Sequence, residues 1–230
     1  MRFLLVNKNR LLCSWIFETS ITGEVRSCDY TIVKMALPYL AWPAVAVMYI
    51  LFEVHYFLHS IAITILTMLQ TKKHPLEESV YYSICSTTDL DLQIHMNNAR
   101  YLRECDFARF KFWCQCGMPR ASRAQNAKIL LGGATIRYRR PLQLFDTFRI
   151  KSKILWWDEK AFILEQKIER TQDDFVCAIM LAKQSVVNST PEKLLREIVG
   201  EEIQRPECPP DVQKWIECNE ISSRNLRKID

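Results

Sequence analysis

Two aspartates and one histidine lie close together around the expected start of a long helix. Asp91 and His95 occupy a polar loop just before that start, and Asp106 lies about two turns inside the helix. A carboxylate can attack a carbonyl carbon itself, or it can deprotonate the water molecule that attacks. A histidine can orient a carbonyl group or a side-chain amide. We therefore take Asp91, His95 and Asp106 as the candidate catalytic residues.

The start of the helix supplies a positively polarised group. Asn97 or Asn98 is suited to cap the helix, because a short amide side chain accepts hydrogen bonds from the backbone N–H groups of the first turn. The N–H groups near Asn97 to Ala99 also form the positive end of the helix dipole, which suits a developing oxyanion. Asn97 and Asn98 are therefore candidate substrate-binding residues as well as caps.

Each candidate also has a purely structural interpretation. Asp91 can form an Asx turn, and His95 can brace the same loop. Asp106 lies three residues from both Arg103 and Arg109, a spacing that allows an ion pair on the helix face. We favour Asp91 as the active carboxylate, because a loop carboxylate ahead of the helix can reach a carbonyl that the helix start polarises. The spacing alone leaves both carboxylates open.

The composition indicates one globular domain with an additional segment. The chain has 230 residues, of which 49% are apolar and 25% charged, and this excludes a disordered, collagenous or repeat protein. Its net charge of +5 comes from interspersed residues, so no basic block indicates nucleic-acid binding. The nine cysteines are scattered and odd in number, which favours reduced thiols in a domain that faces the cytosol. Cys114 and Cys116 lack the spacing of a zinc site, so we expect no metal.

The additional segment is a long apolar stretch near the start of the chain. Ala36 to Phe52 contains no formal charge, and Val54 to Gln70 contains none either. A stretch of this length can span a bilayer, so residues 35–70 are expected to form a membrane anchor. We expect one part to cross the bilayer and the rest to lie along the interface or against the following domain. Two alternatives are a buried core helix and a cleaved secretory signal, which would make the protein secreted.

The boundaries around the anchor define the remaining organisation. Residues 1–34 form a poorly organised extension, and Met35 is an alternative start of translation directly before the apolar stretch. Residues 71–76 form a linker that contains Lys72 and Lys73. These lysines favour an orientation in which the rest of the chain stays in the cytosol. We expect the membrane to be that of the endoplasmic reticulum.

After the linker, the pattern changes to strands around one helix. The helix, from Asn97 or Asn98 to about Cys116, is apolar around much of its girth, and short turns between the later strands indicate antiparallel neighbours. Residues 77–190 thus form an α+β domain, and residues 191–230 form an extension that ends in an amphipathic helix from Asp211 to Lys228. The expected strands are Tyr81–Ser86, Thr135–Arg140, Thr147–Trp157, Ala161–Arg170 and Phe175–Val187.

The segment around the candidate residues resembles a known family. Asp91-Leu-Gln-Ile-His-Met-Asn-Asn-Ala-Arg-Tyr101 is similar to the D-x-x-x-H-x-N-N-x-x-Y signature of hotdog acyl thioesterases, both the 4-hydroxybenzoyl-CoA type and the plant acyl-carrier-protein type. Tyr138 to Leu142, followed by Asp146, resembles the second and third strands of that family, and Trp156 to Phe162 resembles its next hairpin. The resemblance implies the hotdog fold, an antiparallel sheet wrapped around a central helix.

The resemblance also implies an activity. It implies hydrolysis of an acyl-CoA or a similar thioester in lipid metabolism, by a homodimer whose sites lie between the subunits and which needs no metal or organic cofactor. In the family, the active carboxylate occurs at a loop position that Asp91 matches or at a helix position near Asp106. Three basic residues could attract the phosphates of CoA: Arg137, Arg139 and Arg140.

A second class of function remains open. Ile94 stands where the enzymes usually carry Gly or Gln before the histidine. A non-catalytic acyl-binding, lipid-binding or scaffold protein of the endoplasmic reticulum membrane could keep the fold without the chemistry. Composition does not separate this protein from an enzyme.

The expected orientation can be tested at the one glycosylation sequon, Asn188-Ser-Thr190. Glycosylation of an Asn-x-Thr site requires exposure to the lumen, and the expected orientation places this site in the cytosol. We therefore expect the native protein to show no change in mass after glycosidase treatment. A glycosidase-sensitive shift would reverse the orientation.

Overall fold

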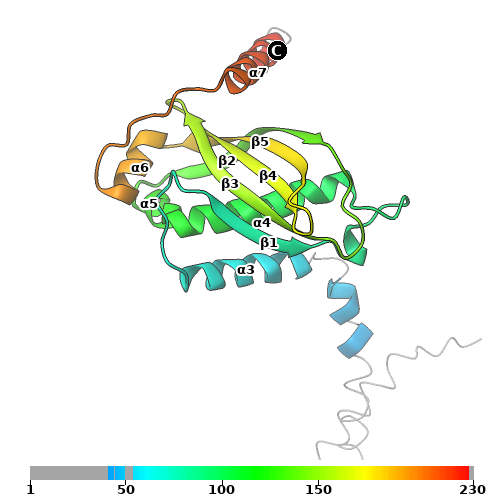
Figure 1. Ribbon diagram of the computed structural model, residues 1–230. Coiled ribbons are helices and arrows are strands. Elements are labelled where there is room, and N and C mark those ends of the chain that lie inside the picture. Colours follow the sequence, from blue (N-terminus) through cyan, green and yellow to red (C-terminus); the bar gives the residue numbers. More distant parts are fainter. Residues whose placement is uncertain (1–40, 44, 50–53, 228–230) are drawn as a thin grey trace, which may run out of the picture. The chain divides into compact units, whose positions relative to one another are not determined.

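A computed structural model describes residues 41–43, 45–49 and 54–227 of the chain. The expected extension at residues 1–34 and the alternative start at Met35 lie outside these residues. The chain divides into two compact units, residues 1–57 and residues 58–230. The second unit contains the candidate residues, and its elements are coloured from cyan to red in Figure 1.

The helices and strands follow the order predicted from the sequence, with three short helices added. The strands are β1 (Ser79–Ile84), β2 (Lys128–Tyr138), β3 (Thr147–Trp157), β4 (Ala161–Arg170) and β5 (Val176–Val187). The helices are α3 (Val54–Met68), the 3-10 helix η1 (Thr87–Asp89), α4 (Asn98–Cys116), α5 (Met118–Ala124), α6 (Pro191–Val199) and α7 (Pro210–Arg227).

The strands form one antiparallel sheet in the order β1-β3-β4-β5-β2. Helix α4 lies along one face of this sheet (Figure 1). Its apolar side chains are buried on several sides of the helix, as predicted, because the sheet curves around it. This arrangement confirms the expected hotdog fold. The buried apolar residues of α4 are Tyr101, Cys105, Phe107, Ala108, Phe112, Trp113 and Cys116.

The two ends of α4 are determined locally. The side-chain oxygen of Asn97 accepts a hydrogen bond of 2.9 Å from the backbone N–H of Ala99, as expected of a cap. At the other end, Gly117 adopts a φ of 84°, and its N–H bonds to the carbonyl of Cys114. Only glycine enters this left-handed conformation without a steric cost. The helix therefore begins and ends where the sequence predicted.

Every second residue of β3 is expected on one buried face, because side chains alternate along a strand: Phe148, Ile150, Ser152, Ile154 and Trp156. The structure follows this pattern for most of the strand and then departs from it. Phe148, Ile150 and Ile154 are buried as predicted. An irregularity between Ile154 and Trp156 then moves the pattern by one residue, so Trp157 is fully buried and Trp156 is not. The prediction that Trp156 continues the buried face was wrong for this reason.

The bounds of β1 and β2 differ from those predicted, and β2 also ends at Tyr138 rather than at Arg140. Strand β1 runs from Ser79 to Ile84, not from Tyr81 to Ser86, because the side chain of Asp89 accepts the N–H of Ser86 at 2.9 Å and draws that residue into the cap of η1. Strand β2 begins at Lys128, seven residues before the predicted Thr135. Its first half is interrupted at Gly132 and Gly133 by a register shift. A Cβ atom on Gly132 would collide with Ser185, which explains the glycine at that position.

Besides the 3-10 helix η1, the helices α5 and α6 were not predicted. Helix α5 follows directly after Gly117, and α6 begins at Pro191, which we had expected to end the domain. Proline fits the first helical position because its missing N–H has no partner there in any case. Leu194 and Leu195 of α6 are buried. Helix α7 agrees with the predicted terminal helix as far as Arg227.

The described part of the expected anchor contains the helix at Ala41–Tyr49 and helix α3. Within residues 41–43, 45–49 and 54–227, no single helix is both long and apolar enough to cross a membrane. The helix at Ala41–Tyr49 and helix α3 satisfy the length and composition requirement only when they are taken together as a bent pair.

The left-handed cap of α4 gives a stability prediction. We expect Gly117→Ala to lower the free energy of unfolding by about 1 kcal/mol, because an alanine Cβ is strained at this φ although no neighbouring atom lies within 4 Å of it. Gly133→Ala is the matched control, since its Cβ also meets no atom within 4 Å and its φ is not in the left-handed range. Urea denaturation followed by circular dichroism measures both. Equal losses in the two variants would contradict the prediction.

Candidate active site

A cavity of about 390 Å³ lies where the loop before α4 meets the end of β2. Five of the eight predicted site residues line it, from two segments about forty positions apart. Their convergence is the main observation at this site. The lining residues are Asp91, Gln93, His95, Met96, Asn98, Tyr101, Tyr138, Arg139, Arg140 and Pro141.

Asp91 and His95 form the polar pair of the cavity. One carboxylate oxygen of Asp91 accepts the backbone N–H of Gln93 at 2.9 Å, which is the Asx turn of the structural interpretation. The other oxygen lies 3.5 Å from Nδ1 of His95. Both side chains are about one-quarter exposed. Asp91 therefore shapes the loop through one oxygen and faces the imidazole through the other.

The loop is held by backbone hydrogen bonds to its surroundings. The N–H of Met96 donates to the carbonyl of Leu142 at 2.8 Å, and the N–H of Asn97 donates to the carbonyl of Asp89 at 2.8 Å. The side chain of Met96 is almost completely buried. Nε2 of His95 lies 3.0 Å from the side-chain oxygen of Gln93. These contacts keep the Asp91–His95 pair at the start of α4.

Two tyrosines, Tyr101 and Tyr138, line the cavity although neither was selected from the sequence. Their rings meet edge to face at 5.3 Å. The hydroxyl of Tyr138 donates to the backbone carbonyl of Asn98 at 2.8 Å, and the hydroxyl of Tyr101 accepts the N–H of Leu142 at 2.9 Å. Burial raises the pKa of Tyr101 to about 12, so it remains a neutral phenol. The position of Tyr101 in the family signature was the signal available in the sequence.

The arginines separate into two groups. The guanidinium of Arg140 lies 3.7 Å from the ring centre of Phe175 and 2.7 Å from Asp173, and Arg139 lies 4.8 Å from the same ring. These contacts hold Arg139 and Arg140 at the rim of the cavity. Arg137 is exposed on β2 and does not line the cavity.

Two further predicted residues also lie outside the cavity. Asn97 points its side-chain oxygen into the helix as a cap. Asp106 forms an ion pair with Arg109, whose guanidinium is buried and also donates to the side-chain oxygen of Gln166 at 2.6 Å. The structural interpretation of Asp106 therefore describes its contacts, and within this chain it does not lie beside Asp91.

No metal site is apparent among the described residues. In residues 54–227 and the short described stretches before them, no group of three or more His, Cys, Asp or Glu side chains could hold a metal ion. The seven cysteines in this part of the chain are free thiols.

Comparison with known proteins extends the resemblance seen at Asp91 to Tyr101. Residues 85–216 match the thioesterase-like superfamily. Protein THEM6 of Xenopus laevis is 38% identical over 82% of this chain and 91% of its own length. Protein THEM6 of Danio rerio is 39% identical over 76% of this chain and 88% of its own length. The apolar stretch and the run from Asp106 to Arg109 also resemble thioesterase superfamily member six, and the names of these relatives confirm that resemblance.

A solved structure was compared as well. The crystal structure of YbaW, a probable thioesterase from Escherichia coli, is 26% identical, covers 54% of this chain and 98% of its own, and has a TM-score of 0.47.

Helix α4 also carries a buried carboxylate, Glu104, which no pattern in the sequence singles out. It is 8% exposed, and its carboxylate accepts a hydrogen bond of 3.4 Å from the hydroxyl of Tyr81. Burial raises the pKa of Glu104 above its ordinary value, and the nearby Asp89 adds to this effect. Glu104 does not line the cavity, so its shifted pKa concerns stability.

Glu104 makes stability depend on pH. The folded state holds the proton of Glu104 more tightly than the unfolded state does, so stability falls as the pH rises from the ordinary glutamate pKa of about 4.3 through the raised pKa of the folded state. We expect Glu104→Gln to raise the free energy of unfolding at neutral pH, with a gain that disappears below pH about 4. Denaturation of both proteins across this pH range tests the prediction, with Glu220→Gln on α7 as an exposed control. A gain that does not change with pH would contradict it.

Proposed function

The chain belongs to the thioesterase-like superfamily, and from this premise we propose that it hydrolyses an acyl-CoA or a similar thioester at the cavity before α4. The observation that carries the proposal is the placement of the Asp91–His95 pair beside the first turn of α4 in one cavity. A carboxylate, an imidazole and a helix N-terminus are the groups that attack on a carbonyl carbon requires.

In the proposed reaction, the carboxylate oxygen of Asp91 that faces Nδ1 of His95 is the general base. It removes a proton from a water molecule as the water oxygen attacks the thioester carbonyl. The oxyanion that forms is stabilised by the positive end of α4. The C–S bond then breaks, the carboxylic acid is released, and the proton passes through His95 to the departing thiolate. Asp91 and His95 return to their initial protonation states.

The rim of the cavity suits a CoA substrate. Arg139 and Arg140 present two guanidinium groups beside Asp91, and guanidinium groups bind phosphates through paired hydrogen bonds. Phe175 and Asp173 hold these arginines in place, which lowers the conformational entropy that they lose when phosphate binds. Arg137 lies farther along the same strand and would contact only an extended part of CoA.

We also propose that the protein is a homodimer that pairs through β2. Strand β2 pairs with β5 along one edge, and no strand in the described part of the chain pairs with its other edge. Leu130 and Leu131 are about half exposed on this strand. An open edge with exposed leucines is suited to pairing with a second copy. The Tyr138 end of β2 reaches the cavity, so a partner there would lie close to both sites.

A non-catalytic acyl-binding protein is the second candidate. One oxygen of Asp91 is already used in the Asx turn, and Gln93 contacts His95, so the loop is satisfied without substrate. The exposed apolar stretch before the domain supports attachment of either protein to a membrane, which we propose is the endoplasmic reticulum with the domain in the cytosol.

Substitution of the two aspartates separates the candidates. We expect Asp91→Asn to lower turnover of acyl-CoA by on the order of a hundredfold or more while stability changes little, because the amide keeps the turn but cannot accept a proton. Asp106→Asn should retain most of the turnover. It should lower the free energy of unfolding by about 1–2 kcal/mol, because the buried guanidinium of Arg109 loses its carboxylate.

The measurement is release of thiol from acyl-CoAs of several chain lengths by the purified full chain, together with the melting temperature of each variant. Full activity in both variants would exclude both carboxylates from catalysis. Absence of thiol release by the unsubstituted protein with every chain length would favour the acyl-binding protein.

A further inference from the structure

Helix α3 has the reverse of the polarity expected at the surface of a water-soluble domain. Between Leu58 and Met68, four of the five side chains on the side that faces the sheet and α4 are polar. In the same stretch the opposite side has no polar side chain, and its large residues are all at least half exposed, whereas the turn before it carries the exposed His55. The inner side consists of His59, Ser60, Ile63, Thr64 and Thr67. The outer side consists of Leu58, Ile61, Ala62, Ile65, Leu66 and Met68.

Contacts with the domain fix the rotation of α3 about its axis. Nε2 of His59 lies 2.8 Å from the hydroxyl of Tyr81, and the imidazole ring packs 4.4 Å from the ring of Phe107. The hydroxyl groups of Thr64 and Thr67 donate to carbonyls of the same helix, at 2.8 and 2.6 Å. A rotation that buried the apolar side would break the contacts of His59. The apolar side is therefore held outward.

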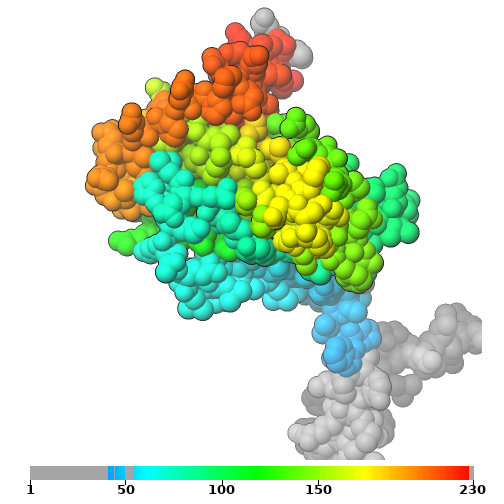
Figure 2. Space-filling view, viewed as in Figure 1, coloured from blue at the N-terminus to red at the C-terminus, as the bar shows by residue number. Residues whose placement is uncertain are grey.

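The end of α3 is also held, beside the end of α4. The side-chain amide of Gln115 donates to the side-chain oxygen of Gln70 at 2.8 Å, and the N–H of Lys73 donates to the carbonyl of Gln115 at 3.1 Å. Because His59 meets Phe107 and Gln70 meets Gln115, α3 and α4 run side by side in the same direction. Figure 2 shows α3, in cyan, at the surface of the domain.

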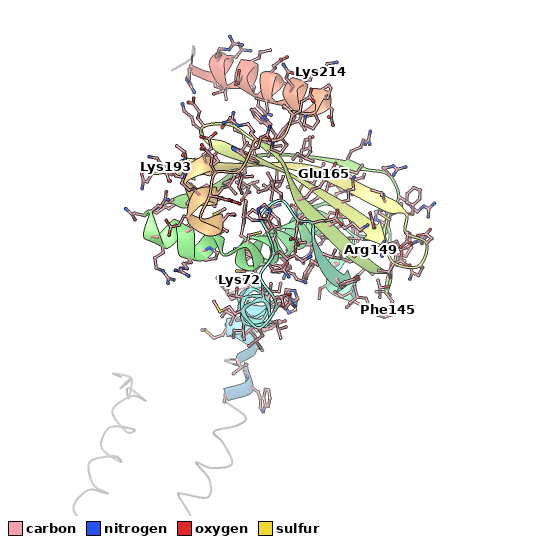
Figure 3. All side chains as sticks on the ribbon, turned by 60° about the vertical axis from the view of Figure 1, so that its left-hand side comes forward. Lys72, Phe145, Arg149, Glu165, Lys193 and Lys214 are labelled. Carbon is pink, nitrogen blue, oxygen red and sulfur yellow. The ribbon has the colours of Figure 1, made fainter. Side chains whose placement is uncertain are left out.

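Basic residues follow the end of α3. Lys72 is exposed just after α3 (Figure 3) and shares a surface hollow with Arg120 of α5, which Glu197 of α6 also lines. The ammonium group of Lys73 donates to the carbonyl of Glu78, and that of Lys111 donates to the carbonyl of Val80. Cations beside an apolar helix face are the arrangement that binds an anionic lipid surface. A second copy stacked on the same face would bring like charges together.

We propose that the outer side of α3 lies in the plane of a lipid bilayer, at the boundary between headgroups and acyl chains, with Lys72 and Arg120 at anionic headgroups. This inference rests on the proposed membrane attachment but not on thioester hydrolysis. The proposal places the second half of the apolar stretch, residues 54–70, at the interface. A helix whose polar side contacts the domain cannot be surrounded by lipid on all sides. The part that crosses the bilayer, if one does, must then precede α3.

The test measures the depth of single positions of the full chain in vesicles of phosphatidylcholine with a minority of phosphatidylserine. An environment-sensitive fluorescent amino acid is introduced at Leu58, Ile61, Ile65 or Met68 in turn, and lipids brominated at different depths serve as quenchers. An in-plane helix places the four probes at one shallow depth. A spanning helix would separate the probes at Leu58 and Met68 by roughly 15 Å along the bilayer normal. Ile221 on α7, which is 52% exposed, is the matched control.

Each outcome decides the proposal. Shallow and equal quenching at the four α3 positions, with none at Ile221, supports it. Depths that increase steadily along α3 show a span and overturn it. Probes that are shielded from water but unquenched by lipid show that protein, such as a second copy, covers the face, and this also overturns it. A chain that does not bind vesicles overturns it together with the anchor. Thiol release from acyl-CoA, measured on the same samples, reports separately on the enzyme.

Discussion

The fold depends on the burial of helix α4, whose apolar side chains must be covered on more than one side. Its buried apolar side chains point in several directions, so contact with one flat surface would leave some of them in water. A curved antiparallel sheet covers one side of the helix (Figure 1), and α3 covers part of another side through Phe107. Burial of a large side chain such as Phe112 contributes about 2 kcal/mol relative to exposure, so the wrapped helix is the main source of cohesion. Gln166 is satisfied within this arrangement, since it accepts from Arg109 and donates to Ser152, whereas the buried Nε1 of Trp157 has no hydrogen-bond partner among the residues that the structure describes.

Enclosure of α4 also determines where chemistry can occur. The sheet covers the middle of the helix, and its first turn reaches the end of β2, where Asn98 and Tyr101 line the cavity near the positive end of the helix dipole. The preceding loop returns to the connection between β2 and β3 through the hydrogen bond from Met96 to Leu142, and this bond places Asp91 and His95 beside that turn. A loop with hydrogen bonds at both ends holds a polar pair more rigidly than a free loop would. The proposed chemistry thus follows from the same packing that stabilises the fold.

The sequence predicted the features that local interactions determine. The ends of α4 depend on Asn97 and Gly117 alone, and the Asp91–His95 pair lies within five residues of one loop. The features that it did not predict depend on distant contacts. The early start of β2 follows from the close approach of Gly132 to Ser185, and the shift at Trp156 follows from a bulge against β4. The contacts of Asp106 outside the cavity depend on the buried Arg109, which reaches Gln166, 57 residues away. From their charge alone, Arg137, Arg139 and Arg140 were all predicted to bind the phosphates of CoA. The path of β2 places only Arg139 and Arg140 at the cavity.

The parallel course of α3 and α4 connects the proposed membrane face with the proposed active site. Packed helices lie about 8–10 Å apart, so an α3 that lies in the plane of the bilayer holds α4 one layer above it. Phe107 meets His59 only two to three turns from the start of α4, which keeps the cavity at nearly the same height above the interface. An acyl-CoA partitions between water and the membrane surface, with its acyl chain in lipid and its phosphates in the headgroup layer. A site held at this height, with Arg139 and Arg140 at its rim, is placed to take such a substrate from the interface with little displacement of its phosphates.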